Sequence, residues 1–241
     1  MDALELSGIE RALVVTAHPD DVDFGFAGTV ARLTDSGIDV TYCIVTDGDA
    51  GGAETGMPRD EMAPKRREEQ TAAAAVVGVH DLHFLGYPDG RVESTLDLRR
   101  DISRVIRLVR PDRVLMQSPD RNWDRIYASH PDHLAVGDAT IAAVYPDARN
   151  RWAHPELEAE GLEPWTVPQV WMGAGGPQVT HYIEITDSVD RKIEALLCHK
   201  SQLPDPEATG QMVRGWTSMI ATSAGLPEGR FAEAVRIVVT S

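Results

Sequence analysis

Four short apolar runs in the first half of the chain alternate with segments that have the apolar spacing of helices. The runs are rich in Val, Leu and Ile and lie at residues 12–17, 39–46, 81–85 and 113–117. Runs without polar alternation are typical of strands buried on both faces, as in a parallel sheet. The intervening helical patterns cover residues 24–33, 66–77 and 96–109. This alternation predicts an α/β fold with a doubly wound, mainly parallel sheet and right-handed crossovers.

The second half of the chain has a less regular pattern. We expect a helix at 130–143, a Pro-, Trp- and charge-rich excursion at 145–166, strands at 167–172 and 180–186, a helix at 187–202, and a tail of loop and helix. No internal repeat, low-complexity segment or clean linker divides the 241 residues, a length that suits one large α/β domain. We therefore expect a single domain over residues 1–241 with a less regular C-terminal extension.

The bulk composition argues against two classes of partner. A formal net charge of −15 repels phosphate backbones, and no Lys/Arg cluster beyond residues 65–67 offsets it, so we expect no nucleic-acid partner. No stretch approaches the roughly 20 apolar residues of a membrane helix, and residues 1–5 lack the basic start of a signal peptide. We expect a cytoplasmic protein whose partner is a small molecule, and the sequence leaves a homo-oligomer open.

The first predicted strand ends in a charged cluster, HPDD at residues 18–21, where burial makes charge costly. A dinucleotide site would need a G-x-G-x-x-G turn here, but Gly25 and Gly28 come too late and two aspartates occupy the turn. A nucleotide site is therefore not expected. Taken alone, the cluster is also compatible with a plain helix N-terminus in which the aspartates serve as cap and dipole partners.

A second cluster, HPDH at residues 130–133, follows the strand at 113–117. In each cluster, ligand-type residues lie three positions apart at a predicted helix start, which places them on one face of the first turn. If both strands belong to one parallel sheet, both clusters emerge at the same edge. We expect His18, Asp21 and His133 to bind one metal ion with a position left open for water, the pattern of a catalytic zinc site. Ferrous iron accepts the same ligands, so both metals stay open.

The other residues of the clusters suit roles in metal-assisted hydrolysis of an amide or ester. Asp20, beside a ligand but pointing elsewhere, is the expected general base. His130, one turn from His133, is expected to hydrogen-bond the developing oxyanion and to protonate a leaving amine. Asp132 is expected to orient His130 and keep it cationic.

Both clusters and several further segments make the chain resemble the LmbE-like zinc deacetylases, also called the PIG-L family. The similar segments are AHPDDVDFGFAGTVARL, VTDGDAGG, RREEQTAAAAVVGVHDLHFLGYPDG, HPDHLAVGDATIAAVY and RKIEALLCHKSQ, within a core at about residues 11–202. The resemblance implies a Rossmann-like core and removal of an acyl group, usually acetyl, from an amino-sugar conjugate such as an N-acetylglucosaminide. It assigns metal, base and oxyanion roles to the positions given above, and it adds Arg66 and Asp89 as substrate contacts.

Some alternatives stay open at this point. Arg66 could instead pair with Glu69 along its helix, and Asp89 could serve only its Pro-Asp-Gly turn. The chemistry does not fix the size of the acyl group, so an amidase for a larger acyl group is one alternative function. A metal-dependent sugar-binding protein without turnover is another, although a pure binder needs neither the base Asp20 nor the acid His130.

Two long polar segments, at 47–64 and 118–129, follow predicted strands at the edge where open α/β sheets bind ligands. We expect them to border the site, or the first to be merely flexible. Trp123 in the second segment suits either stacking on a sugar ring or a hydrophobic lid contact. The other histidines are expected at the surface or in the core; His199 stands apart because it lies in the HKSQ segment that resembles the family.

Overall fold

The computed structural model describes residues 6–52, 56–123, 125–126 and 129–241. At its centre lies one sheet, with strands β1 (Arg11–Thr16), β2 (Asp39–Thr46), β3 (Asp81–Tyr87), β4 (Arg113–Met116), β5 (Gln169–Gly173), β6 (His181–Glu184) and β7 (Ala232–Val239). Their order is β3-β2-β1-β4-β5-β7-β6; β1 to β5 run parallel, and β7 is antiparallel to both neighbours. The predicted doubly wound, mainly parallel sheet is confirmed.

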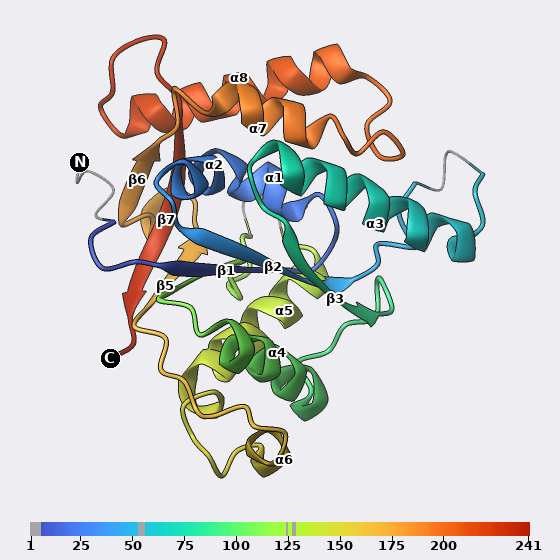
Figure 1. The fold of residues 1–241 in the computed structure, drawn as a ribbon. Coiled ribbons are helices and arrows are strands. Elements are labelled where there is room, and N and C mark those ends of the chain that lie inside the picture. Colours follow the sequence, from blue (N-terminus) through green and yellow to red (C-terminus); the bar gives the residue numbers. More distant parts are fainter. Residues whose placement is uncertain (1–5, 53–55, 124, 127–128) are drawn as a thin grey trace.

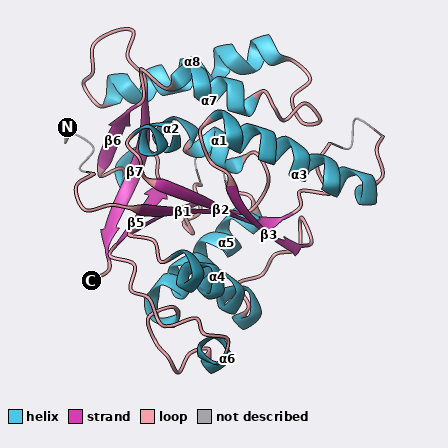
Figure 2. Cartoon of the chain, in the orientation of Figure 1, coloured by secondary structure: helices cyan, strands magenta, loops and turns pink. Residues whose placement is uncertain are grey.

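Helices cover both faces of this sheet (Figures 1 and 2). One face carries α1 (Asp21–Gly25), α2 (Ala27–Asp35), α3 (Arg59–Val76), α7 (Val189–Leu196) and α8 (Pro206–Ser223). The other carries α4 (Leu96–Val109), α5 (Pro131–Ala142) and the π-helical turn η3 (Ala143–Asp147), with α6 (Pro155–Ala159) beyond them; a 3-10 turn, η4 (Gly176–Gln178), precedes β6. None of the described helices is both long and apolar enough to cross a membrane.

The two apolar cores explain why the strand sequences carry so little polar alternation. Successive strand residues point to opposite faces, so Val14 and Ile44 join one core while Leu13 and Val45 join the other. Because each face of the sheet is covered by helices, both sets must be apolar.

Strands β1 and β4 end together, which brings distant segments of the chain to one edge. Val15 pairs with Met116 near the ends of the two strands. The N–H of Ala17, just past β1, donates to the side-chain oxygen of Gln117, just past β4, at 2.9 Å. The HPDD and HPDH clusters therefore leave the sheet at the same edge, as the sequence predicts.

The helical pattern at 24–33 forms two helices rather than one. Phe26 leaves helical geometry (φ −135°) and separates α1 from α2. The helix predicted at 66–77 begins earlier, at Arg59, so the last third of the polar segment 47–64 is helical. Residues 53–55 of that segment, and 124, 127 and 128 of the segment 118–129, lie outside the described residues. Trp123 is 80% exposed.

Strand β7 lies inside the sheet, where the sequence predicts only loop and helix. A buried charge hides its pattern: Glu233 is 3% exposed. Its carboxylate accepts hydrogen bonds from Lys192 Nζ (2.7 Å) and from the backbone N–H groups of Gly28 (3.1 Å) and Thr29 (2.8 Å) at the start of α2. A carboxylate is favourable at a helix N-terminus. Apolar periodicity does not signal such polar contacts. The sheet therefore extends beyond residue 202, where the sequence predicts the end of the core.

Gly137 lets α5 approach the end of β4 closely. A Cβ on Gly137 would lie 2.8 Å from the backbone nitrogen of Pro119 and 2.9 Å from the backbone oxygen of Gln117. These backbone atoms cannot rotate away, so we expect Gly137→Ala to destabilise the protein by about 1–3 kcal/mol, although alanine alone favours a helix by about 1 kcal/mol. Urea denaturation measures the change. Gly215→Ala in α8 is the control, because a Cβ added there would meet no atom within 4 Å, and it should not destabilise the protein. If Gly137→Ala is tolerated equally well, the prediction is wrong.

Candidate active site

Three predicted metal ligands meet just beyond the carboxyl ends of β1 and β4. His18 Nδ1 lies 3.3 Å from the Asp21 carboxylate and 3.2 Å from His133 Nε2. The same His133 nitrogen lies 3.0 Å from the other oxygen of Asp21. The backbone N–H of His18 also donates to the Asp21 carboxylate at 2.7 Å, which closes the turn between strand and helix. His18 and Asp21 are therefore brought together by local structure, and His133 by the parallel pairing of the strands.

The donor set of these side chains fits a divalent transition-metal ion. Two imidazole nitrogens and a carboxylate are ligands that zinc and ferrous iron both accept. Among the described residues, no lysine or arginine forms an ion pair with Asp21, and only His18 and His133 do. Burial opposes ionisation of Asp21, yet these two rings hold its pKa well below the ordinary range. The site is therefore built around an ionised carboxylate that is paired with imidazole rings and, among the described residues, with no lysine or arginine. A ring nitrogen of His130 also lies within 4.8 Å of one on His18 and one on His133.

The second nitrogen of His18 faces two further carboxylates. Its Nε2 lies 3.0 Å from Asp89 Oδ1 and 3.2 Å from Asp132 Oδ2. Burial of the ring opposes protonation, but Asp132, Asp21 and Asp89 together raise the pKa of His18 to about 12. A carboxylate on the outer nitrogen of a histidine is the usual way to fix the ring of a metal ligand. Nδ1 is the nitrogen that faces Asp21 and His133, the other two predicted ligands.

The structure corrects the role expected for Asp132. Its carboxylate does not orient His130; it contacts His18 and accepts hydrogen bonds from the backbone N–H groups of Gly90 (2.7 Å) and Val92 (3.2 Å). Burial raises the pKa of Asp132, but the hydrogen bonds with His18 and the two N–H groups together lower it by more, so the net shift is downward. Asp132 therefore stays ionised and holds the ring of His18, one of the predicted metal ligands.

His130 caps α5 and is exposed. Its Nδ1 accepts the backbone N–H of Asp132 at 3.2 Å, so a neutral ring carries its proton on Nε2. Partial burial, and then the neighbouring His18 and His133, lower the pKa of His130 below its ordinary value. The expected cationic state is thus not favoured. The ring offers instead a neutral Nε2–H donor, with its centroid 4.9 Å from that of His18.

Asp20 sits in a strained backbone conformation between the strand and α1. Its φ of 94° lies in the left-handed region that non-glycine residues rarely adopt, at a cost of about 1–3 kcal/mol. Burial raises the pKa of Asp20 to about 6, against the opposing effect of the Arg66 guanidinium, which donates to its carboxylate at 2.8 Å. A carboxylate with this pKa is an effective proton acceptor near neutral pH.

Arg66 and Asp89, expected as substrate contacts, are almost fully buried and engaged with the protein. Arg66 donates to the carboxylate of Asp20 and to the carbonyl oxygen of Gly48, at 3.0 Å. It does not pair with Glu69, which binds the N–H and hydroxyl of Ser201 instead. Asp89 accepts the N–H of Ala50 at 3.0 Å in addition to facing His18. Both residues therefore support other site residues, and a direct contact with substrate stays a prediction.

Sequence reasoning missed one residue that holds the proposed base. The side chain of Gln70, fully buried on α3, accepts the backbone N–H of Asp20 at 2.8 Å. A glutamine in an amphipathic helix carries no signal that separates this role from simple packing. The contact became evident only from the packing of α3 against α1.

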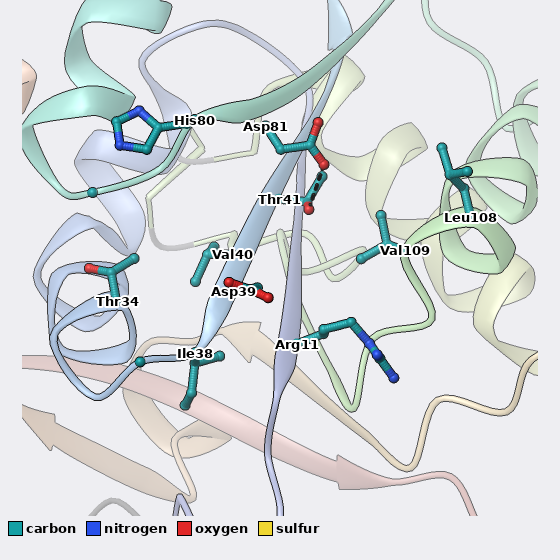
Figure 3. A pocket seen from close by; sticks show the side chains of 12 residues that line it. Arg11, Thr34, Ile38, Asp39, Val40, Thr41, His80, Asp81, Leu108 and Val109 are labelled. Atoms are coloured by element: carbon teal, nitrogen blue, oxygen red, sulfur yellow. Dashed lines mark hydrogen bonds between the residues drawn. The ribbon is translucent and has the colours of Figure 1, made fainter.

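A separate hollow lies at the opposite edge of the sheet (Figure 3). It has a volume of about 500 Å³, and its lining includes Arg11, Asp39 and Asp81, the first residues of β1, β2 and β3. Ligands of open α/β sheets bind at the carboxyl ends of the strands. The HPDD and HPDH clusters lie at the carboxyl ends of the strands. We therefore place the site at that edge and not in this hollow.

Part of the sequence matches a known protein family. Residues 13–144 match the PIG-L family, described as GlcNAc-PI de-N-acetylase. The chain belongs to this family. Proteins of the PIG-L family and the named relatives below are deacetylases, enzymes that act on amide bonds, so the family and enzyme class predicted from the sequence are confirmed.

Two relatives of this PIG-L chain are similar to it over most of its length. The diacetylchitobiose deacetylase of Thermococcus kodakarensis is 34% identical, over 95% of this chain and 84% of that protein. A probable N-acetyl-alpha-D-glucosaminyl L-malate deacetylase 2 of Bacillus anthracis is 31% identical, over 80% of this chain and 81% of that protein. Among solved structures, N,N'-diacetylchitobiose deacetylase from Pyrococcus horikoshii aligns with a TM-score of 0.89 and 26% identity, covering 99% of this chain and 88% of that one.

Proposed function

We propose that this chain hydrolyses the N-acetyl amide of an amino-sugar conjugate that carries an N-acetylglucosamine unit. The observation that carries the proposal is the convergence of His18, Asp21 and His133 to within 3.0–3.3 Å of one another, beside Asp20. We propose zinc as the ion that these three side chains hold, with ferrous iron as the alternative. The relatives named for deacetylation of chitobiose and glucosaminyl-malate support the substrate class.

A zinc ion held by these residues supplies Lewis-acid activation of water and of the amide carbonyl. Asp20 accepts the proton that the attacking water loses as its oxygen bonds to the carbonyl carbon. The Nε2–H of His130 donates to the carbonyl oxygen as negative charge develops there. Asp20 then returns its proton to the amide nitrogen, the C–N bond breaks, and acetic acid and the free amine leave; the acid passes its proton to the amine or to solvent to give acetate. This assignment replaces the proton transfer from a cationic His130 that the sequence predicts.

We propose that Asp132 and Asp89 act through His18, and that Arg66 acts through Asp20. The two carboxylates fix the His18 ring from its outer nitrogen, which keeps Nδ1 aimed at Asp21 and His133. The guanidinium of Arg66 holds one oxygen of Asp20. These contacts support positioning roles.

Acetate release from a panel of N-acylated glucosaminides tests the proposed substrate class. The panel should contain N-acetylglucosamine, its dimer, and conjugates to inositol and malate, each also with a longer acyl chain. We expect the highest kcat/KM with an acetyl conjugate. A clear preference for the longer acyl group favours the amidase alternative, and tight binding without release favours the non-catalytic alternative.

Removal of the metal should abolish turnover. We expect dialysis against a chelator to lower kcat by roughly 100-fold or more, because Lewis-acid activation supplies several kcal/mol and about 1.4 kcal/mol corresponds to a factor of ten. Adding back zinc, ferrous or cobalt ions should restore the rate in proportion to the metal bound, measured by elemental analysis. Full turnover in a preparation shown to be metal-free overturns the proposal.

The remaining expectations from the sequence stay predictions. They are a single domain over residues 1–241, a cytoplasmic location, no nucleic-acid partner, and an open oligomeric state. Size-exclusion chromatography with light scattering decides the last of these.

A further inference from the structure

We propose that Gln70, Asp23 and His199 are positioning residues that hold the proposed base, Asp20, in its left-handed backbone conformation. The inference rests on the proposed function, since it concerns the group that takes the proton from water. It extends that function to the HKSQ segment, whose histidine the hydrolytic reaction does not otherwise use.

The three side chains form one chain of hydrogen bonds that ends at Asp20. His199 Nε2 lies 2.8 Å from Asp23 Oδ2, and Gln70 Nε2 donates to the same oxygen at 3.0 Å. The other end of the Gln70 amide accepts the backbone N–H of Asp20 at 2.8 Å. Because the Asp20 N–H can only donate, the amide oxygen of Gln70 must face it, and the amide nitrogen then faces Asp23. Asp23 therefore fixes Gln70, and His199 fixes Asp23.

Burial makes this chain of contacts rigid. Gln70, Asp23 and His199 are each 0% exposed, so water does not compete for their polar groups and each lost partner leaves an unsatisfied buried atom. The elements involved are α3, α1 and the segment after α7, which are far apart in sequence but packed on one face of the sheet (Figure 1). Lys192 reinforces the same region by donating to the carbonyl oxygens of Asp23 and Phe24.

The backbone of Asp20 needs such support. A non-glycine residue with a φ of 94° relaxes toward negative φ unless its surroundings hold it in place. Relaxation would move the Asp20 carboxylate relative to the ligands His18 and Asp21 on either side of it. A displacement of about 1 Å at a reacting group can cost about 10²-fold in rate, so loss of the network should appear in kcat.

The first test is Gln70→Met, which keeps the length of the side chain but removes both hydrogen bonds. We expect faster hydrogen exchange at the amide of Asp20, by NMR, and a kcat lower by about 10²-fold. KM should stay within about twofold, and the metal content should match the parent, because neither substrate binding nor a ligand has been removed. Thr71→Val is the matched control: Thr71 is the exposed neighbour of Gln70 on α3, its hydroxyl donates to the carbonyl oxygen of Arg67 in the same helix, and the substitution should change none of these values.

The second test compares two variants of His199. In His199→Gln the amide nitrogen takes the place of Nε2 and can still donate to Asp23, so we expect near-parent kcat and near-parent exchange at the Asp20 amide. In His199→Leu the donor is gone, so kcat should fall and hydrogen exchange at the Asp20 amide should become faster, as in Gln70→Met. A residue that only fills space would show the opposite order or no difference. This pair also decides the question if Gln70→Met does not fold.

The outcomes separate this inference from the proposed function. If Gln70→Met and His199→Leu change Asp20 exchange and kcat no more than Thr71→Val does, or if metal is lost in proportion to activity, the positioning role is wrong. If the parent hydrolyses none of the amides tested, the proposed function fails, while amide exchange still shows whether the network holds the Asp20 backbone.

Discussion

Replacing Asp20 with asparagine is expected to lower kcat by about 10²–10⁴-fold, the usual contribution of a general base, without loss of metal. Asparagine is the best probe because it tolerates the left-handed conformation that Asp20 adopts (φ 94°). Its amide oxygen can also accept the hydrogen bond that Arg66 donates to the carboxylate. The substitution therefore removes proton acceptance while leaving the turn intact. Assays of kcat with elemental analysis of the same samples measure the two effects.

Asp47→Asn is the matched control for this substitution. Asp47 also follows a strand, β2, and its carboxylate is likewise paired with an arginine, Arg67, at 2.7 Å. It lies outside the proposed machinery, so kcat should stay within about threefold of the parent. If Asp20→Asn loses metal in step with activity, Asp20 is a ligand rather than the base; if it keeps full activity, another group takes the proton.

The meeting of the two clusters was predictable because it follows from strand geometry. Continuous apolar runs imply a parallel sheet, and parallel strands deliver their C-terminal residues to one edge. His18 and His133 are far apart in sequence, yet that rule places them at the same edge, and the pairing of β1 with β4 brings their nitrogens to 3.2 Å. The continuous apolar runs also predicted that the strands in the first half of the chain run parallel.

The partner of Asp132 was not predictable because it depends on contacts across the fold. Sequence proximity suggested His130, two positions away. The first turn of α5 instead directs the carboxylate to the N–H groups of Gly90 and Val92, and so to His18. Local spacing shows which residues share a helix face, but not which loop from another strand lies opposite that face.

Buried polar residues account for the other differences. Glu233 interrupts the apolar pattern of β7, and Gln70 looks like an ordinary polar residue of a helix. Each is satisfied by partners distant in sequence: Lys192 for the first, and Asp20 and Asp23 for the second. A sequence shows the cost of burying such groups, whereas only the packed structure shows what offsets it.

The two histidines of the second cluster should respond differently to substitution. His133→Ala removes a nitrogen that lies 3.0 Å from Asp21 and 3.2 Å from His18, so metal affinity and activity should fall together, and excess zinc should recover part of the loss. The remaining ligands no longer make the set of three that a catalytic zinc site uses. Metal titration beside activity measures both effects.

His130→Asn should instead keep the metal and lose rate. Asparagine is a favourable N-cap, so it can still accept the N–H of Asp132 that His130 Nδ1 accepts at 3.2 Å, and α5 should stay intact. The Nε2–H donor is gone, and loss of one oxyanion donor costs about 10²–10³-fold in kcat. Because the ring nitrogens of both histidines lie within 4.8 Å of one on His18, metal content decides between them. If the His130 variant loses metal while the His133 variant retains it, the two roles are exchanged; if both retain it, the three ligands proposed here are not the metal site.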